Sequence, residues 1–475
     1  MKRYGPTAML IRLFSILLVA VFAVSCAGTR RAVPAAPVLP ATFSASGVEA
    51  APEAWWTALG DPDLDTLVRH GLTNNFSLRA AWDRLVQAEA VAARQGAALV
   101  PTVDAEASAG RTRRETGSPS STTYENEYGV ALVASYELDV WGRVRALRDA
   151  AAIEASATER DVHAAALTLS AEIALTWFSL VEQRGQAALL YDQIATSEKG
   201  LDVLRTRFRS GRGGAVDVLQ QEQLVETRRG DAETVAARIR VLENRIAVLV
   251  GEVPGFAVPP RDTLPALPAV PATGVPLDVL HQRPDVARSL ARVEAADRRV
   301  AAAVADRLPR LGLSAGLSST APEVDDVFSD WLASIAANLA GPVIDGGARR
   351  AEVARAEAAR SEAINTYRQA MLDAFAETED ALVQEQRQRA LLQSLDRQAG
   401  LARQITDNLR DRFLGGNEDF LRILTAEVNR QSLDRQRLAA HRQLIDYRIG
   451  LYRALAGGFP LERPAPAPLE RGMTP

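Results

Sequence analysis

Long stretches of the chain carry apolar residues three and four positions apart, the spacing of a buried helical face. Residues 143–210 and 348–414 keep this rhythm throughout and contain no proline. At 1.5 Å per residue each segment would be about 100 Å long as one continuous helix. Many residues on the apolar faces are small, so the pattern predicts long helices packed as an antiparallel coiled coil.

Shorter helical patterns accompany the long ones. Residues 61–99 have helical spacing, and Asp61-Pro62 is typical of a helix start. Three further segments share this spacing: 216–250, 277–307 and 417–456. The Pro-rich residues 251–276 predict an irregular connector. Asp139 and Asp345 precede the long helices, and we expect their carboxylates to cap the helix N-termini.

Two regions change the period from 3.6 to 2. In residues 102–109 apolar residues alternate with polar ones, which include Asp104, Glu106 and Ser108. A second alternating run places Tyr128 and Tyr136 on one face. Such alternation is typical of half-buried strands, so we expect a hairpin over about residues 102–138 with a loop at residues 115–126.

The second half of the chain repeats this alternation over residues 310–341. Ser314 is among its polar positions, the loop is expected at residues 321–330, and Trp331 opens the last run. Each of the four expected strands is about ten residues long. Four strands of this length are too few to close a membrane barrel in one chain.

The two halves of the chain share one order of elements. The segment that ends at Phe208 and Gly211 has a counterpart 205 positions later at Phe413 and Gly416. We therefore interpret residues 55–250 and 277–458 as two repeats of one unit. Residues 26–54, rich in Ala and Pro, are expected to form a tether, and residues 459–475 a flexible tail.

Composition narrows the class of protein. Apolar residues make up 47% of the chain but aromatic residues only 5%, which favours closely packed helices over a bulky core. The formal charge is −4, so a nucleic-acid partner has no electrostatic support. The overall fold class that we predict is mainly α with a small β part.

The N-terminus resembles an export signal. Lys2 and Arg3 precede an uncharged apolar run at residues 13–25, which is too short to span a bilayer. The sequence Ala23-Val24-Ser25-Cys26 is similar to a lipoprotein signal, so residues 1–25 would be removed and Cys26 would carry the lipid, as in palmitate-bearing lipoproteins. The alternative is a simple secretory signal with an incidental cysteine.

Residues that could carry catalysis are scattered. The four histidines lack metal-ligand spacing, and the single cysteine has no partner in the sequence. The glycines of residues 211–214 do not follow an expected strand and are not followed by the Lys-Ser/Thr of a phosphate-binding loop. We expect no enzyme activity, cofactor or metal site.

Several motifs in this order resemble the TolC-like outer-membrane factors, in their NodT-like lipoprotein branch. They are residues 136–142 (Tyr-Glu-Leu-Asp-Val-Trp-Gly), residues 283–286, residues 342–347 and the two Arg-Phe-x-x-Gly segments. The resemblance covers about residues 55–458. It implies a homotrimer whose four strands per chain close a 12-stranded β-barrel in the outer membrane, continued by an α-helical barrel across the periplasm.

The resemblance also implies a function. Such proteins are passive exit ducts of tripartite efflux systems, working with a periplasmic adaptor and an inner-membrane RND-type pump. The apolar strand faces would contact outer-membrane lipid and the polar faces a watery lumen, with the hairpin loops outside the cell. Tyr128, Tyr136 and Trp331 would belong to the interfacial aromatic belt.

The helix turns would face the pump. Positions that match the adaptor-contacting tips are Arg207, Gly211, Gly213, Arg412, Gly416 and Asn417. For the periplasmic aperture we predict that Asp217 and Arg422 pair between helices and hold the entrance closed, with Glu418 and Asp419 as alternative partners; Thr425 lies at the same level. The alternative is that these are ordinary solvated charges at helix ends.

Two other readings of the whole chain stay open at this point. The strands could form a half-buried hairpin in a soluble α+β protein. The chain could also be a periplasmic coiled-coil structural lipoprotein without a pore. The alternating runs flanked by aromatic residues favour the duct, because a spacer needs no such strands.

Overall fold

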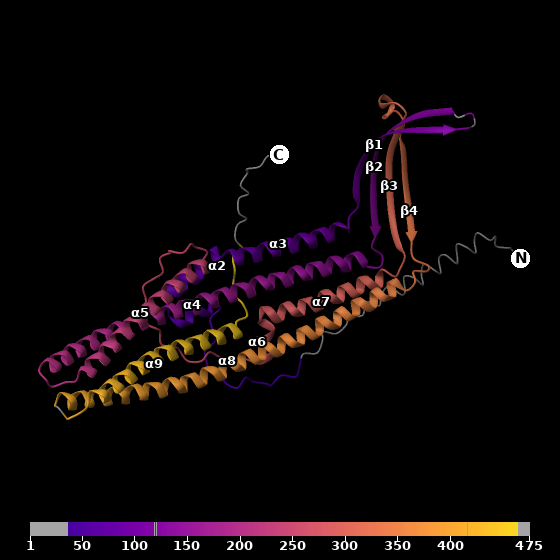
Figure 1. Cartoon of the computed structure of the whole chain (residues 1–475). Coiled ribbons are helices and arrows are strands. Elements are labelled where there is room, and N and C mark those ends of the chain that lie inside the picture. Colours follow the sequence, from indigo (N-terminus) through magenta and orange to yellow (C-terminus); the bar gives the residue numbers. More distant parts are fainter. Residues whose placement is uncertain (1–36, 118, 120, 416, 464–475) are drawn as a thin grey trace. The chain divides into compact units, whose positions relative to one another are not determined.

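The computed structural model describes residues 37–463 apart from 118, 120 and 416. The expected signal peptide, Cys26 and Gly416 lie outside the described residues. The described chain is mainly helical with one four-stranded antiparallel sheet, which confirms the predicted fold class (Figure 1).

The first half of the chain runs through a short 3-10 helix, four α-helices and a hairpin. Their bounds are η1 Trp55–Leu59, α2 Pro62–Asn74, α3 Phe76–Ala97, β1 Thr102–Thr116, β2 Ser121–Leu138, α4 Arg143–Arg209 and α5 Ala215–Leu249. The α4 helix is 67 residues long. Asp139 accepts hydrogen bonds from the backbone N–H groups of Val144 and Arg145, so it caps the start of α4 as expected.

The second half has the same order of elements. Their bounds are α6 Pro276–Gln282, α7 Pro284–Ala305, β3 Arg310–Ala321, η2 Val324–Asp326, β4 Leu332–Ala340, α8 Ala348–Leu414 and α9 Phe420–Leu455. The α8 helix is again 67 residues long. Asp345 accepts hydrogen bonds from the N–H groups of Gly347 and Arg349 before α8, as Asp139 does before α4.

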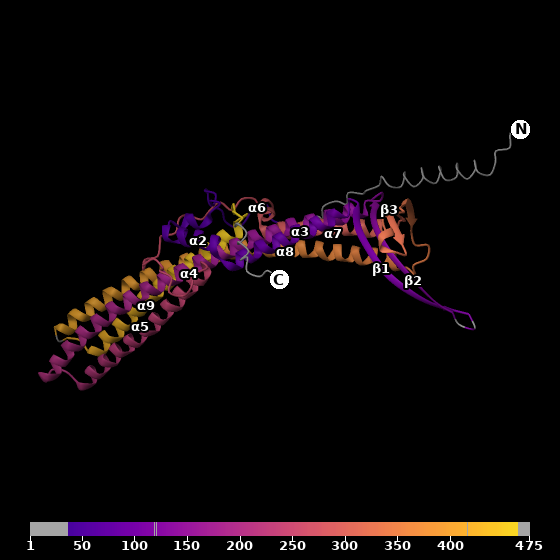
Figure 2. The ribbon, with the colours of Figure 1, turned by 90° about the horizontal axis from the view of Figure 1, so that it is seen from above.

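The described chain divides into two compact units. One holds the sheet and the adjoining helix segments, in residues 86–157 and 289–367. The other holds residues 37–85, 158–288 and 368–463. In this second unit the segments of α4, α5, α8 and α9 next to the helix turns run side by side in both ribbon views (Figures 1 and 2).

The first hairpin is longer than the sequence predicted. The expected loop at residues 115–126 is wrong, because β1 and β2 pair without a break from Thr102↔Ser135 to Thr116↔Ser121. Residues 111–116 and 121–126 are rich in Thr and include Tyr124, which favour strands even without apolar alternation. A ribbon exposed on both faces needs no apolar side, so the period-2 signal is absent there.

The two helices predicted over residues 61–99 and 277–307 are each split in two. Asn75 separates α2 from α3: its backbone is extended, its side chain accepts from the Leu78 N–H, and it donates to the Leu249 carbonyl. In the second half, Pro284 disfavours a helical conformation for Arg283, whose backbone is extended, and α6 and α7 are separated there. The α9 helix also begins later than expected, at Phe420, because Asp419 is its N-cap.

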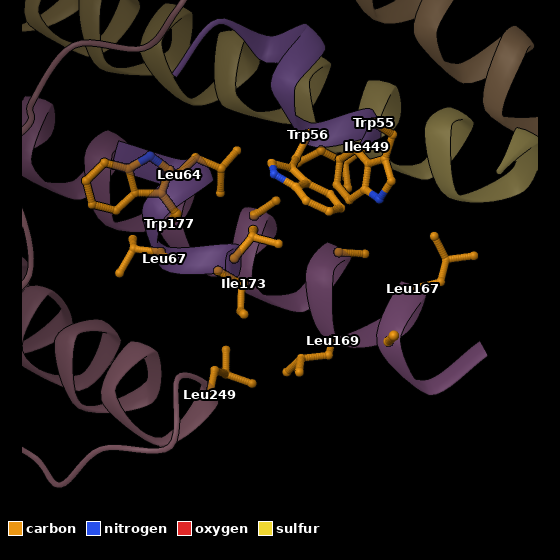
Figure 3. Packing of buried hydrophobic residues seen from close by; sticks show 14 of the residues in the cluster. Trp55, Trp56, Leu64, Leu67, Leu167, Leu169, Ile173, Trp177, Leu249 and Ile449 are labelled. Atoms are coloured by element: carbon orange, nitrogen blue, oxygen red, sulfur yellow. The ribbon is translucent and has the colours of Figure 1, made fainter. Parts of the chain in front are cut away.

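The main hydrophobic core belongs to the second unit. Trp55, Trp56 and Trp177 lie among the aliphatic side chains of α2, α4, α5 and α9 (Figure 3). The indole N–H of Trp177 donates to the Asp61 carboxylate at 2.8 Å, and that of Trp55 donates to the Ser170 hydroxyl at 3.1 Å. These bonds pair the indole N–H groups of two buried tryptophans, which offsets the cost of removing those groups from water.

The segments expected to be a tether and a tail are partly packed. Phe43 is buried and stacks on Phe375 at 5.4 Å between ring centroids. Gly47 donates its N–H to the Pro271 carbonyl, which ties the segment to the connector. At the other end Phe459 is buried edge-on against Trp56 at 5.0 Å. The aromatic side chains explain the difference, because a loose segment would leave them in water.

Candidate functional site

The strand register gathers the apolar positions of all four strands on one face of the sheet. Val103 lies opposite Ala134, Ala134 opposite Ala315, and Ala315 opposite Ile335. The next apolar row pairs in the same way, from Ala105 through Leu132 and Leu317 to Ala333. Ile335 is 89% exposed. A continuous apolar face this exposed is typical of strands that contact lipid.

The polar positions share the opposite face. Asp104, Glu106 and Ser108 alternate with the apolar residues of β1, and Ser314 holds the equivalent place in β3, opposite Ser135. Small residues such as Gly312 and Gly316 accompany them. These four residues therefore lie on the sheet face opposite the apolar one, as the alternation predicted.

The sheet has two open edges. Its strand order is β1-β2-β3-β4, so β1 and β4 each have one side without a paired strand in the described chain. Every side chain of β1 and of β4 is exposed. Unpaired backbone groups of this kind are untenable in lipid, where each costs several kcal/mol.

Two of the three expected belt aromatics lie on the apolar face. Tyr128 and Tyr136 both point to the side of Val130 and Leu132, because all four have even numbers in β2. Eight residues span about 27 Å along a strand, or about 20 Å of height at the usual tilt. Trp331 lies just before β4 begins, half exposed, with its ring 6.2 Å from that of Phe328, and its place in the belt stays a prediction.

The first helix turn joins α4 to α5. Gly211 adopts a left-handed backbone with φ 70°, and Arg212 donates its N–H to the Arg207 carbonyl at 2.8 Å. This arrangement closes the end of α4, and the positive φ requires glycine. At the start of α5 the Asp217 carboxylate accepts the Gly214 N–H at 3.3 Å. Gly213, half-buried, packs against Arg207.

The second helix turn joins α8 to α9 and has the same backbone closure. Asn417 donates its N–H to the Arg412 carbonyl at 2.9 Å. Asp419 accepts the Leu421 N–H and thereby caps α9. The Glu418 carboxylate is only 8% exposed and pairs with Arg422 at 2.9 Å and with Arg412 at 3.9 Å.

Asp217 and Arg422 have separate partners within the chain. Asp217 contacts the Gly214 N–H, while Arg422 binds Glu418, the alternative partner named from the sequence. The reason is local: Glu418 directly precedes the N-cap Asp419, and its carboxylate lies 2.9 Å from Arg422 in the first turn of α9. Thr425 donates its hydroxyl to the Leu421 carbonyl within the helix. A pair between Asp217 and Arg422 of different copies stays a prediction.

Sequence reasoning missed a contact that joins the two turns. The Arg207 guanidinium lies 4.2 Å from the ring centroid of Phe413 and donates to the Phe413 carbonyl at 3.4 Å. Phe413 in turn lies 6.1 Å from Phe420, which is buried. Phe420 replaces Ala215 at the matching position of the first turn. That substitution is the signal that could have revealed an aromatic cluster in one turn only.

A buried polar network continues above the turns. Arg228 of α5 donates to the Gln431 side chain of α9 at 3.0 Å, and both are almost fully buried. Gln431 donates to Glu427, which Arg430 also holds. Burial alone would raise the pKa of Glu427, but the hydrogen bonds and charge of Arg430 outweigh it and lower the pKa. Glu427 is therefore ionised at neutral pH, and the network links α5 to α9.

Among residues 37–463, with the three gaps noted above, His, Cys, Asp and Glu side chains form no group of three that could hold a metal ion. The described chain instead offers an apolar sheet face, two open edges and two helix turns. These features suit assembly and passage through a membrane.

Comparison with known proteins decides the family. The sequence profile described as "Outer membrane efflux protein" matches residues 67–252 and 275–457, well over half of the chain. The chain belongs to the outer membrane efflux protein family. The two matched segments lie on either side of the connector.

Curated relatives of this efflux protein carry related names. It is 32% identical over 426 residues to the pyoverdine export outer membrane protein OpmQ of Pseudomonas aeruginosa, covering 86% of this chain and 88% of OpmQ. It is 28% identical over 414 residues to the toluene efflux pump outer membrane protein TtgI of Pseudomonas putida, covering 84% and 86%. These relatives are outer-membrane efflux proteins, and so is this protein.

Solved structures show the same fold. The outer-membrane channel OprN superposes with a TM-score of 0.80 at 26% identity, covering 89% of the efflux protein and 99% of OprN. CusC superposes with a TM-score of 0.82 at 23% identity, covering 90% and 99%. The efflux protein therefore has the fold of outer-membrane channels, which are not enzymes.

Proposed function

We propose that three copies of the efflux protein close a 12-stranded β-barrel in the outer membrane and form a passive exit duct. The observation that carries the proposal is the four-stranded sheet with one apolar face and two open edges. Pairing β4 of one copy with β1 of the next removes every edge, as a membrane barrel requires. Three copies of four strands are enough to enclose a lumen.

The polar face of the sheet would line that lumen. Asp104 and Glu106 project to this side, together with small residues that leave room for a passing molecule. The long helices α4 and α8 would continue the duct into the periplasm as an α-helical barrel. If Cys26 is lipidated, it anchors the mature N-terminus in the same membrane.

An inner-membrane pump of the RND type and a periplasmic adaptor would supply energy and cargo. The names of the relatives refer to pyoverdine, toluene and solvents, so small molecules are the cargo class we propose. The tips at Arg207, Gly211, Gly213, Arg412, Gly416 and Asn417 would contact the adaptor. The aperture at Asp217, Glu418, Asp419, Arg422 and Thr425 would set the width of the entrance.

The full-length protein, purified from outer membranes, tests this function. We expect a trimer that resists SDS until it is heated, and discrete conductance steps in planar lipid bilayers. A soluble monomer without conductance after removal of the lipid anchor would instead indicate the structural lipoprotein without a pore.

The tip contacts have their own test. Gly213→Cys and Asn417→Cys are expected to cross-link to the adaptor in cells, whereas Val241→Cys on an exposed part of α5 away from the turns should not. Equal cross-linking from all three positions would contradict tip-specific docking.

A further inference from the structure

The β1–β2 hairpin extends past the rest of the sheet. The last paired residue of β3 is Ala321, opposite Tyr128. Beyond this row β1 and β2 continue alone as a two-stranded ribbon, visible in both ribbon views (Figures 1 and 2). The ribbon includes residues 111–116 of β1 and 121–126 of β2.

Two arginines of the ribbon share the apolar face of the sheet. Arg111 and Arg113 follow Val103, Ala105, Ala107 and Ala109 in the odd-numbered series of β1. Asn126 lies opposite Arg111, and Tyr124 opposite Arg113. The face that carries apolar side chains within the sheet therefore carries positive charge immediately beyond it.

The height of these arginines follows from the register. Ala109 lies opposite Tyr128, the last aromatic residue of the apolar face before β3 ends; Tyr124, further along the same face, belongs to the ribbon. Arg111 is two residues further, which is about 7 Å along the strand. A side chain one row above the aromatic rim of a membrane barrel reaches the level of the lipid headgroups.

The charges on the two faces of the hairpin differ in sign. On the odd-numbered face of β1, which continues the apolar face, Glu115 is the acidic residue beside Arg111 and Arg113. Its pair with Arg113 is long, at 3.5 Å, and both side chains are more than half exposed. Such a pair contributes little and leaves Arg113 available. The even-numbered face of β1 and its partners carries Arg114 against four acids: Asp104, Glu106, Glu125 and Glu127.

The Arg111 side chain is also held in place. Its guanidinium lies 4.9 Å from the ring centroid of Tyr124. Stacking on a ring orients a guanidinium while its N–H groups stay free to donate. An oriented arginine beside a second one suits bidentate binding of phosphate oxygens.

We propose that Arg111 and Arg113 bind the phosphate groups of outer-leaflet lipids and fix the barrel at its extracellular rim. This inference rests on the proposed function, because it takes the apolar face to contact lipid and the hairpin to point out of the cell. Each trimer would present three such sites. Charge complementarity selects phosphorylated lipid headgroups as the ligand.

Binding of purified lipid A to the full-length protein in detergent tests this proposal, with bound copies counted by native mass spectrometry. The double variant R111Q/R113Q is expected to lose about thirtyfold in affinity for bisphosphorylated lipid A, and each single variant about fivefold. Affinity for dephosphorylated lipid A should not change. Arg114→Gln is the matched control, since it removes the same charge from the same hairpin on the opposite face.

Four outcomes would overturn the proposal: unchanged affinity in the double variant, an equal loss in Arg114→Gln, equal binding of dephosphorylated lipid A by the natural protein, or equally tight binding of pyrophosphate alone. The last would indicate a site for free anions. Trimer content and conductance are measured on the same sample. Conducting trimers without phosphate preference overturn this inference alone, whereas a monomer without conductance overturns the proposed function with it.

Discussion

The two helix turns have one backbone design and different side-chain support. In both turns a backbone N–H donates to the carbonyl five residues earlier and closes the helix end. The Arg212 N–H binds the Arg207 carbonyl, and the Asn417 N–H binds the Arg412 carbonyl. The α8–α9 turn adds an aromatic cluster of Phe413 and Phe420, whereas Phe208 of the α4–α5 turn is 49% exposed. Both closures are made by backbone groups, so the side chains around the turns are free to differ.

The same contrast extends along the following helices. Asp446 of α9 lies in a buried environment beside Arg442, while Val241, the matching position of α5, is 66% exposed. Arg448 of α9 is fully buried and pairs with Glu385 at 2.6 Å. Within the described chain α9 contacts α4, α5 and α8 through side-chain hydrogen bonds. The two halves are therefore not interchangeable.

Substitution of Asp446 is expected to give the largest change in stability of the variants that test this contrast. Burial raises its pKa to about 6, although Arg442 donates to its carboxylate. In the unfolded chain the Asp446 carboxyl ionises near pH 4. Below that pH it is protonated in both states and does not affect the free energy of unfolding. As the pH rises from 4 to 6, the folded state loses stability because only the unfolded state can ionise this group freely. Asp446→Asn should remove about 3 kcal/mol of destabilisation above pH 6 and change little at pH 4.

The midpoint of guanidinium-induced unfolding, measured at pH 4 and pH 7.5, checks the sign. Val241→Asn is the matched control, and we expect it to be neutral at both pH values because the site is exposed. An Asp446→Asn protein that is no more stable than the natural one at pH 7.5 would contradict the destabilising burial of Asp446.

The aromatic cluster provides the next test. Phe413→Ala removes the ring that Arg207 covers and that packs near Phe420, and should destabilise the second turn by about 1–3 kcal/mol. Phe208→Ala should cost less than about 0.5 kcal/mol because its ring is half exposed. Hydrogen exchange of the first turn of α9 and of α5 measures both. Equal loss of protection in the two variants would mean that the turns are supported alike.

Much of the fold could be predicted from the sequence because its periods are long and regular. Sixty-seven residues of helical spacing without proline leave few alternatives to α4 and α8. The apolar alternation likewise predicted which face of the sheet Asp104 and Ser314 occupy, since the pleat allows only two. The prediction failed where neither face is apolar, as in the ribbon of residues 111–116 and 121–126.

The partners at the turns could not be predicted in the same way. Glu418 pairs with Arg422 because the turn before α9 brings their side chains together, whereas the sequence alone also allowed a pair between Arg422 and Asp217. The contact of Arg207 with Phe413 joins residues 206 positions apart. No local period encodes such a contact, and only the packing of α4 beside α8 produces it.

The two turns also differ in how their following helices are capped, and this difference has a smaller effect on stability. Asp419 is itself the N-cap of α9, whereas α5 uses Gly214 as N-cap with Asp217 folding back on it. Asp419→Ala should therefore cost about 1 kcal/mol, and Asp217→Ala only a few tenths to about 1 kcal/mol from the helix dipole. Hydrogen exchange of the first turns of α9 and α5 compares them. A larger effect at Asp217 would reverse the assigned roles.

The aperture prediction involves the smallest free energies. Exposed ion pairs contribute about 0–1 kcal/mol each, so a closed entrance needs the same pair in all three copies of the proposed trimer. If Asp217 meets Arg422 of a neighbouring copy, Asp217→Arg should raise single-channel conductance in planar bilayers, and Asp217→Asn should raise it less. Unchanged conductance in Asp217→Arg would exclude the pair as a latch.

Arg422 distinguishes a contact between copies from its contact with Glu418. Arg422→Gln removes both, so its conductance alone does not separate them. The charge-swapped double variant Asp217→Arg/Arg422→Asp does, because it restores an attractive pair between copies while it places two acids, Glu418 and residue 422, side by side within one copy. Return to the natural conductance would require the contact between copies. Conductance that stays high would assign Arg422 to the second turn alone, and the two turns would then differ in local support without forming a latch.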